Sequence, residues 1–162
     1  MCVLSDRDIL HYFERGKINI QPLDGKYKSV QPASVDLRLG DVDLEPVSSE
    51  HGLKTWVLEP DGKVVLASTY ELISIGDDVV GKVEGKSTLA RKGLLVHCTA
   101  GWIDPGFAGN ITLELVNVSK EPLTLRYLDP ICQIYFMRTT TPVSSLYSGR
   151  YRGSIGIVRA KE

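Results

Sequence analysis

Residues 111–116 read Ile-Thr-Leu-Glu-Leu-Val, and this alternation decides the fold class. In an extended strand Ile111, Leu113 and Leu115 would point to one face and the residues between them to the other. The same period of two recurs in the runs 35–39, 63–67 and 70–74, each of which is predicted to be a short strand. Gly, Pro, Asp and Asn separate the runs at the spacing expected of a β-sandwich or jelly roll. The sequence therefore predicts a mainly β fold.

One short helix is predicted at the N-terminus. Ser5 is its expected N-cap, with Asp8 at the third helical position to complete a capping box, and Gly16 is expected to end it. The apolar stripe of this helix is formed by Ile9, Leu10 and Phe13.

The 162 residues carry no internal repeat and no linker, so a single domain over residues 1–162 is expected. From about residue 142 to residue 162 the chain is rich in Ser, Gly, Arg and Tyr and has little apolar pattern. That stretch alone is typical of a mobile C-terminal tail.

Composition excludes several classes of function. The net charge of −1 gives no basic excess for non-specific nucleic-acid binding, so an anionic ligand would need a local cluster of donors. Cys2, Cys98 and Cys132 form no CxxC pair and suit a reducing compartment. No signal peptide is visible, and no apolar run reaches the roughly 18 residues of a membrane span, so a cytoplasmic location without membrane contact is expected.

A candidate phosphate site lies in residues 85–93, Gly-Lys-Ser-Thr-Leu-Ala-Arg-Lys-Gly. Ser87 is the expected N-cap of a helix of one or two turns that Gly93 ends, and a helix N-terminus suits a phosphate. Lys86 and Arg91 add charge, and Thr88 adds a second hydroxyl. The alternative is a capped surface turn with solvated charges. The Walker spacing is absent.

Two carboxylates each have an ordinary and a chemical interpretation. Asp104 begins an Asp-Pro-Gly run, which is typical of a hairpin loop, but its carboxylate could face a sugar hydroxyl or an attacking water. Glu114 shares a strand face with Thr112 and Val116 and is either solvent-facing or a base that activates water.

The histidines, His11, His51 and His97, form no HxxxH, HExxH or HxE motif, and no P-C-x-x-C or G-x-S-x-G motif is present. Zinc-dependent nucleoside deaminases and Ser-His-Asp hydrolases are therefore not supported, and no protein-bound zinc is expected.

Residues 31–40, 85–91, 99–107 and 111–115, with the Cys-Gln-Ile run at 132–134 and the Tyr and Arg residues near 147–151, resemble the dCTP deaminase family. The loop Gly-Trp-Ile-Asp at 101–104 is also similar to that of the trimeric dUTPases. The resemblance implies a distorted jelly roll of the dUTPase-like type, a homotrimer, and active sites between subunits.

The resemblance also implies roles for individual residues. Glu114 matches the general base that activates water for attack at cytosine C4, and Ser87 the serine that orients this water. Ala100 matches the residue whose carbonyl meets the exocyclic amine, and Arg91 the arginine that organises base and carboxylate. Asp104 matches the residue at the deoxyribose, whose dUTPase counterpart positions the water that attacks the α-phosphate.

The nucleotide-binding set implied by the resemblance comprises the phosphate segment, part of one strand and the tail. Its members are Lys86, Ser87, Thr88, Leu89, Ala90, Arg91, Asp104, Thr112, Leu113, Glu114, Gln133, Tyr147 and Arg150. Residues 112–114 would recognise the pyrimidine through their main chain. Mg²⁺ is expected on the substrate triphosphate and not in a protein cage. The implied substrates are dCTP and dUTP, and dTTP is a candidate inhibitor.

Gly101 and Trp102 resemble the family members that continue from dUTP to dUMP and diphosphate, because those members have Gly followed by an apolar residue. The alternatives are a deaminase that releases dUTP, a dUTPase without deaminase activity, and a non-catalytic nucleotide-binding regulator. Two positions depart from the family pattern: Arg150 stands where lysine is usual and Ser154 where glutamine is usual.

Overall fold

The computed structural model describes residues 2–50 and 53–161, so His51 lies outside the described residues. In chain order the elements are α1 (Asp6–Glu14), β1 (Ile18–Gln21), the 3-10 turn η1 (Gly25–Tyr27), β2 (Val30–Gln31), β3 (Ser34–Val42), β4 (Ser48–Glu50), β5 (Leu53–Leu58), β6 (Val65–Ile75), β7 (Val79–Gly85), α2 (Ser87–Ala90), β8 (Leu94–Leu95), β9 (Trp102–Ile103), β10 (Ala108–Asn117), β11 (Leu123–Arg126) and β12 (Pro130–Arg138).

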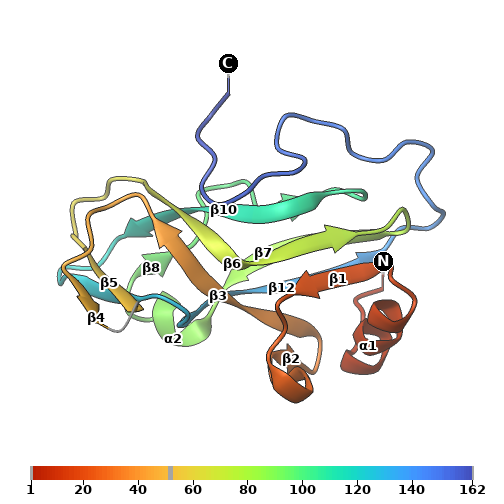
Figure 1. The fold of residues 1–162 in the computed structure, drawn as a ribbon, viewed down its shortest axis with the longest axis horizontal. Helices are drawn as coiled ribbons and strands as arrows, with labels where there is room; N and C mark the ends of the chain where they lie inside the picture. Colours follow the sequence, from red (N-terminus) through yellow and green to blue (C-terminus); the bar gives the residue numbers. More distant parts are fainter. Residues whose placement is uncertain (1, 51–52, 162) are drawn as a thin grey trace.

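The strands form two antiparallel sheets. Among the described residues the larger sheet has nine strands, with the order β8-β10-β6-β3-β12-β7-β9, while β1 adds to β6 and β2 to β3. The smaller sheet has three, in the order β11-β5-β4. Figure 1 shows β4 and β5 at one end of the molecule and α1 at the other. The predicted mainly β fold with a short N-terminal helix is confirmed.

Alternation along β10 is as the sequence predicts. Ile111, Leu113 and Leu115 are buried, whereas Thr112 and Glu114 are half-buried on the other face. The same core contains buried aliphatic and aromatic side chains of β3 and β12, namely Leu37, Leu39, Ile134 and Phe136. Apolar burial of this kind fixes the register, since a slip by one residue would turn Glu114 inward.

The prediction of separate strands at 63–67 and 70–74 is wrong. They belong to one strand, β6, which begins at Val65 and runs to Ile75. Ser68 and Thr69, which lie between the two predicted runs, are buried inside the strand.

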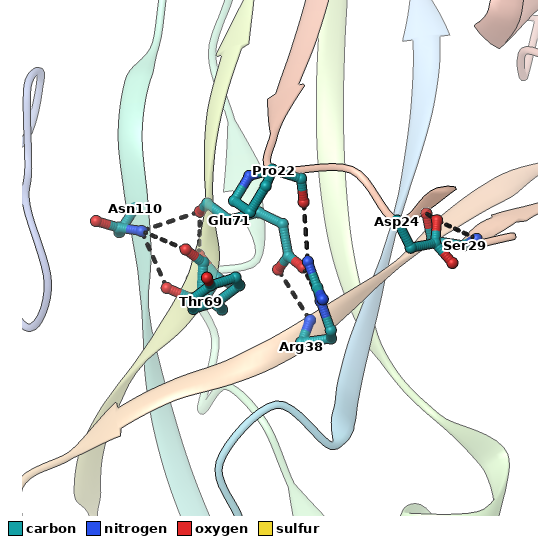
Figure 2. Close-up of polar contacts among 8 residues, drawn as sticks. Pro22, Asp24, Ser29, Arg38, Thr69, Glu71 and Asn110 are labelled. Atoms are coloured by element: carbon teal, nitrogen blue, oxygen red, sulfur yellow. Dashed lines mark hydrogen bonds and ion pairs between the residues drawn. The ribbon is translucent and has the colours of Figure 1, made fainter. Parts of the chain in front are cut away.

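The strand continues because its irregularity is bridged by Asn110 of β10. Pairing shifts between Asn110 and Thr112, which leaves the carbonyls of residues 69–71 outside the regular ladder. The Asn110 side-chain amide donates to the carbonyl oxygens of Thr69 and Glu71, each at 3.0 Å, as Figure 2 shows. An unpaired buried carbonyl would be costly, so this amide stabilises the bulge.

A buried ion pair joins β3 to β6. The Arg38 Nε lies 2.6 Å from Glu71 Oε1, and the Arg38 main-chain N–H donates to Glu71 Oε2. Another guanidinium nitrogen of Arg38 donates to the Pro22 carbonyl after β1 (Figure 2). Glu71 is almost fully buried, and pairing of this kind is what makes a buried carboxylate tolerable.

The N-terminal helix α1 has the predicted capping box between Ser5 and Asp8. Gly16 follows the C-cap with φ +64°, a left-handed conformation that favours glycine. The apolar stripe differs in part from the prediction. Ile9 is buried, Leu10 and Phe13 are only half-buried, and Tyr12, three residues after Ile9, supplies the second buried side chain. No helix among the described residues is long and apolar enough to cross a membrane.

The C-terminal stretch is docked, contrary to the mobile tail that its composition indicates. Figure 1 shows it running over β10. The N–H of Gly153 donates to the Ala108 carbonyl, the N–H of Asn110 donates to the Ser154 carbonyl at 2.8 Å, and Ser154 is buried. Composition did not indicate this because the tail makes most of its docking contacts through its own main chain.

Candidate functional site

The phosphate loop, defined here as residues 85–91, leads from β7 into α2. Ser87 was predicted to be the N-cap, and this is wrong: Ser87 is the first helical residue, and Lys86, with extended backbone, is the N-cap without a side-chain capping bond. The Ser87 and Thr88 hydroxyls and the Arg91 guanidinium belong to exposed residues. The loop therefore presents these donors to solvent.

The Lys86 side chain is held by a carboxylate of strand β3. Its Nζ lies 2.6 Å from Asp36 Oδ2 of β3, and the two side chains are 27% and 18% exposed. The Gln133 side chain of β12 donates from Nε2 to the Gly85 carbonyl at 3.1 Å. The sheet thus fixes both the main chain and the cation at the start of the loop.

Glu114 is oriented by the segment that follows β8. Its Oε2 accepts a hydrogen bond from the Cys98 main-chain N–H at 3.0 Å, and its own N–H donates to the Val96 carbonyl. His97, predicted to lie in a strand, lies in the irregular segment after β8, which ends at Leu95. A carboxylate with one oxygen tied to a main-chain donor has its second oxygen fixed in direction, which suits a base that must meet one water.

Close packing surrounds Gly101. The Gly101 carbonyl accepts from the Val83 N–H at 2.8 Å. A Cβ at this position would lie 2.9 Å from His97 Nε2 and 2.9 Å from the Val83 carbonyl oxygen. Only glycine fits without a shift, and the neighbouring Ala100 stays exposed at the surface.

Asp104 lies in the turn that joins β9 to β10. The Phe107 N–H donates to its carbonyl at 3.1 Å, which confirms the predicted turn. The turn is not a hairpin, because β9 pairs with β7 and β10 with β6. The Trp102 indole N–H donates to Asp104 Oδ1 at 3.1 Å, and both side chains are exposed.

The tail brings Tyr147 to this turn. The Tyr147 N–H donates to the Pro105 carbonyl at 2.8 Å, and its ring lies 6.3 Å from that of Phe107. Arg150 is farther along the exposed tail and donates to the Lys161 carbonyl at 2.6 Å. Tyr147 is therefore held beside the turn that contains Asp104, through Pro105 and Phe107.

The candidate residues fall into two groups within one chain. Figure 1 shows α2 and the C-terminal tail on opposite sides of the molecule. No ion pair among the described residues links Arg91 to Glu114 or to Asp104. The phosphate loop with Gln133 forms one group, and the turn at Asp104 with the docked tail forms the other. Glu114 is tied to the segment after β8.

The sequence interpretation assigned no role to several contacts at the site. They are the Cys98 main-chain N–H, the Trp102 indole N–H, and the side chains of Ser34 and Asp36. The first comes from the main chain and has no signature in the sequence. The Gln-Pro-Ala-Ser-Val-Asp run at 31–36 carries part of the family resemblance, but its contact with the phosphate loop is visible only in the structure.

Comparison with known protein families identifies the family of this chain. The model of the dCTP deaminase-like family matches residues 3–45 and 43–139. The chain belongs to the dCTP deaminase-like family. This confirms the resemblance drawn from the motifs.

Among curated members of the family, a protein of Dictyoglomus thermophilum is 42% identical over 166 residues, spanning 90% of this chain and 84% of the relative. A protein of Methanosphaera stadtmanae is 41% identical over 175 residues, spanning 95% of this chain and 88% of the relative. Both are named dCTP deaminase, dUMP-forming.

Solved structures share the fold. The dCTP deaminase of Agrobacterium tumefaciens superposes with a TM-score of 0.67 at 22% identity, over 85% of this chain and about half (48%) of its own. The native EIAV dUTPase gives 0.55 at 19% identity, over 82% of this chain and 98% of its own. A mutant dUTPase of the S. aureus phage phi11, described with a structural Mg(II) ion, gives 0.54 at 18% identity over 83% and 98%. The dUTPase-like fold is thereby confirmed.

Proposed function

We propose that this chain deaminates dCTP at C4 and then releases diphosphate, so that the product is dUMP. The observation that carries the proposal is the Glu114 carboxylate, held by the Cys98 N–H on a rigid strand of a dCTP deaminase-like fold. The relatives named dUMP-forming support the second step.

In the deamination step Glu114 takes a proton from a water as the hydroxyl oxygen bonds to C4 of cytosine. N3 takes up that proton, the remaining hydroxyl proton passes through Glu114 to the exocyclic nitrogen, the C4–N bond breaks, and ammonia leaves as the C4 carbonyl forms. Ser87 orients the water, Arg91 organises the base and the carboxylate, and the Ala100 carbonyl receives the exocyclic amine. The exposed main chain at Ala100 and the direction of Glu114 fit these assignments.

In the second step Asp104 positions a water for attack at the α-phosphorus, and the bond to the diphosphate oxygen breaks. The Trp102 indole N–H occupies Asp104 Oδ1 and so leaves the other carboxylate oxygen to face the water. Gly101 lets the chain before Asp104 lie close to Val83 and His97, where a Cβ would meet both residues. One site would then serve two bond cleavages in turn.

The active assembly is proposed to be a homotrimer with sites between subunits. Support comes from the position of the phosphate loop and the tail on opposite sides of one chain. Lys86 to Arg91 of one subunit would meet Glu114, Asp104, Tyr147 and Arg150 of another.

Magnesium is proposed to arrive on the triphosphate. Among the described residues no group of three or more His, Cys, Asp or Glu side chains is placed to hold a metal ion, so the phosphates would supply the ligands. When bound, the ion neutralises phosphate charge and helps the diphosphate to leave. A cytoplasmic location fits the free thiols of Cys2, Cys98 and Cys132, and dTTP is proposed as an inhibitor of the same site.

Incubation of the protein with dCTP and MgCl₂, with products resolved by anion exchange, tests the proposal. We expect dUMP, diphosphate and ammonia. Accumulation of dUTP would leave deamination standing and remove the second step, and unchanged dCTP with hydrolysed dUTP would mean a dUTPase. Turnover of neither nucleotide would favour a non-catalytic regulator.

Mixing two inactive proteins, Arg91→Ala and Glu114→Gln, tests the shared site. In the proposed trimer Arg91 and Glu114 of one site come from different subunits. A trimer that contains both variant chains would therefore have some sites with a normal Arg91 and a normal Glu114. We expect dissociation and reassembly of the mixture to restore part of the wild-type activity. Activity that stays absent in mixed trimers would contradict sites between subunits.

A further inference from the structure

The segment 31–36, Gln-Pro-Ala-Ser-Val-Asp, lies beneath the phosphate loop and makes two separate connections to it. In the first, Asp36 Oδ2 lies 2.6 Å from Lys86 Nζ. In the second, the Ser34 hydroxyl donates to Gln133 Oε1 at 3.0 Å, and Gln133 Nε2 donates to the Gly85 carbonyl. Both connections end at consecutive residues of the loop.

The geometry of the sheet places these connections. Gln133 of β12 lies opposite Asp36 of β3 on one side and opposite Glu84 of β7 on the other. Asp36 is thus two strands away from the loop and reaches it with the side chain alone. A further contact from Gln31 Nε2 to Asp36 Oδ2 is long, at 3.5 Å.

The carboxylate of Asp36 depends on Lys86. Its Oδ1 is buried without a hydrogen-bond partner among the described residues, and its Oδ2 is held by the ammonium. A poorly solvated carboxylate with a single strong partner keeps that partner in one place. A free lysine would instead sample many rotamers around the loop.

We propose that Asp36 is a positioning residue for the triphosphate: its carboxylate fixes the Lys86 ammonium at the start of the phosphate loop before the nucleotide binds. The inference rests on the proposed function, because it concerns how the proposed site is organised before the triphosphate binds. Because the Lys86 side chain is already held in place, less conformational entropy is lost when the triphosphate binds. The effect falls on the β- and γ-phosphates and not on the base or sugar.

The test measures dissociation constants for Mg-dCTP and for dCMP, in a Glu114→Gln background that prevents turnover. Asp36→Asn keeps the shape and removes the charge. We expect it to weaken dCTP binding about 10-fold and dCMP binding less than about twofold. In a Lys86→Gln background the same change is expected to weaken dCTP binding by less than about twofold, since its effect passes through Lys86.

Asp41→Asn is the matched control. Asp41 lies on the same strand and pairs with Lys54 at 2.6 Å, at an exposed site away from the loop. Its loss is expected to leave both dissociation constants unchanged. Thermal unfolding without nucleotide checks that Asp36→Asn is folded, and Asp36→Glu, which keeps the charge but moves it, is expected to weaken dCTP binding less than Asp36→Asn.

Three results would overturn the inference: an equal loss for dCMP, an equal loss in the Lys86→Gln background, or no loss for dCTP. Wild-type turnover of dCTP is measured first. If it is absent, the proposed function fails. If it is present and Asp36→Asn has no selective effect, only the inference about Asp36 fails.

Discussion

The phosphate loop and the C-terminal tail are both expected to contact the triphosphate, yet the chain holds them by different means. The loop is tied to the sheet through side chains, with Lys86 paired to Asp36 and the Gly85 carbonyl bound by Gln133. The tail is held mostly through its own main-chain groups, which bond to residues 108–110 and to the Thr112 hydroxyl, together with side-chain contacts from Arg152 and Arg159. The loop is therefore expected to stay fixed as long as the sheet is folded, whereas the tail can detach while the sheet stays folded.

The largest effect is expected from a change at Glu114, which lies on strand β10. Glu114→Gln keeps the shape and removes the base, so deamination should fall by at least about 10²-fold while nucleotide still binds. Ammonia release and a dCTP dissociation constant measure the two properties. Glu59→Gln, at an exposed position outside the site, is the control. Substantial residual deamination would rule out Glu114 as the base.

Asp104→Asn examines the turn to which the tail is attached. If Asp104 positions the hydrolytic water, diphosphate release should fall by roughly 10²-fold, and at least as much as deamination falls. Parallel assays of ammonia and diphosphate compare the loss of deamination with the loss of diphosphate release. Loss of deamination with intact diphosphate release would contradict this role for Asp104.

Gly109→Ala should separate the tail from the sheet. Gly109 has φ +147°, and a Cβ there would lie 2.7 Å from the Ser154 carbonyl oxygen. We expect faster trypsin cleavage within the tail and a KM for dCTP raised about 10-fold, with kcat changed less. Gly62→Ala, also at a positive φ but in open space, controls for backbone strain alone. An unchanged tail cleavage rate would show that Gly109 does not hold the tail.

The smallest effect concerns thiol labelling. Cys2 and Cys98 are exposed, whereas Cys132 is buried and its pKa is raised by desolvation. Iodoacetamide should therefore modify Cys2 and Cys98 and spare Cys132, as peptide mass spectrometry would show. Bound nucleotide should slow the reaction of Cys98 by a few-fold and leave that of Cys2 unchanged. An unchanged rate at Cys98 in the presence of nucleotide would mean that Cys98 is not at the site.

The sequence predicted the elements whose pattern is local. Alternation gave β10 with Glu114 opposite the core face, and the capping box of α1 was read correctly from Ser5 and Asp8. The family also followed from motifs.

Features that depend on distant partners could not be predicted. The length of β6 depends on the Asn110 amide from another strand, and the N-cap of α2 falls on Lys86, whose side chain Asp36 holds. The docking of the tail rests mostly on its own main-chain groups, which no side-chain pattern records.

The most direct test of one site acting on two bonds is a single-turnover experiment. Excess protein is mixed with labelled dCTP without metal, and the reaction is started with Mg²⁺ and an excess of unlabelled dUTP. The account predicts that label passes to dUMP without appearing in the dUTP pool, because the intermediate stays bound. Label that accumulates in dUTP, or remains in dCTP, would contradict it.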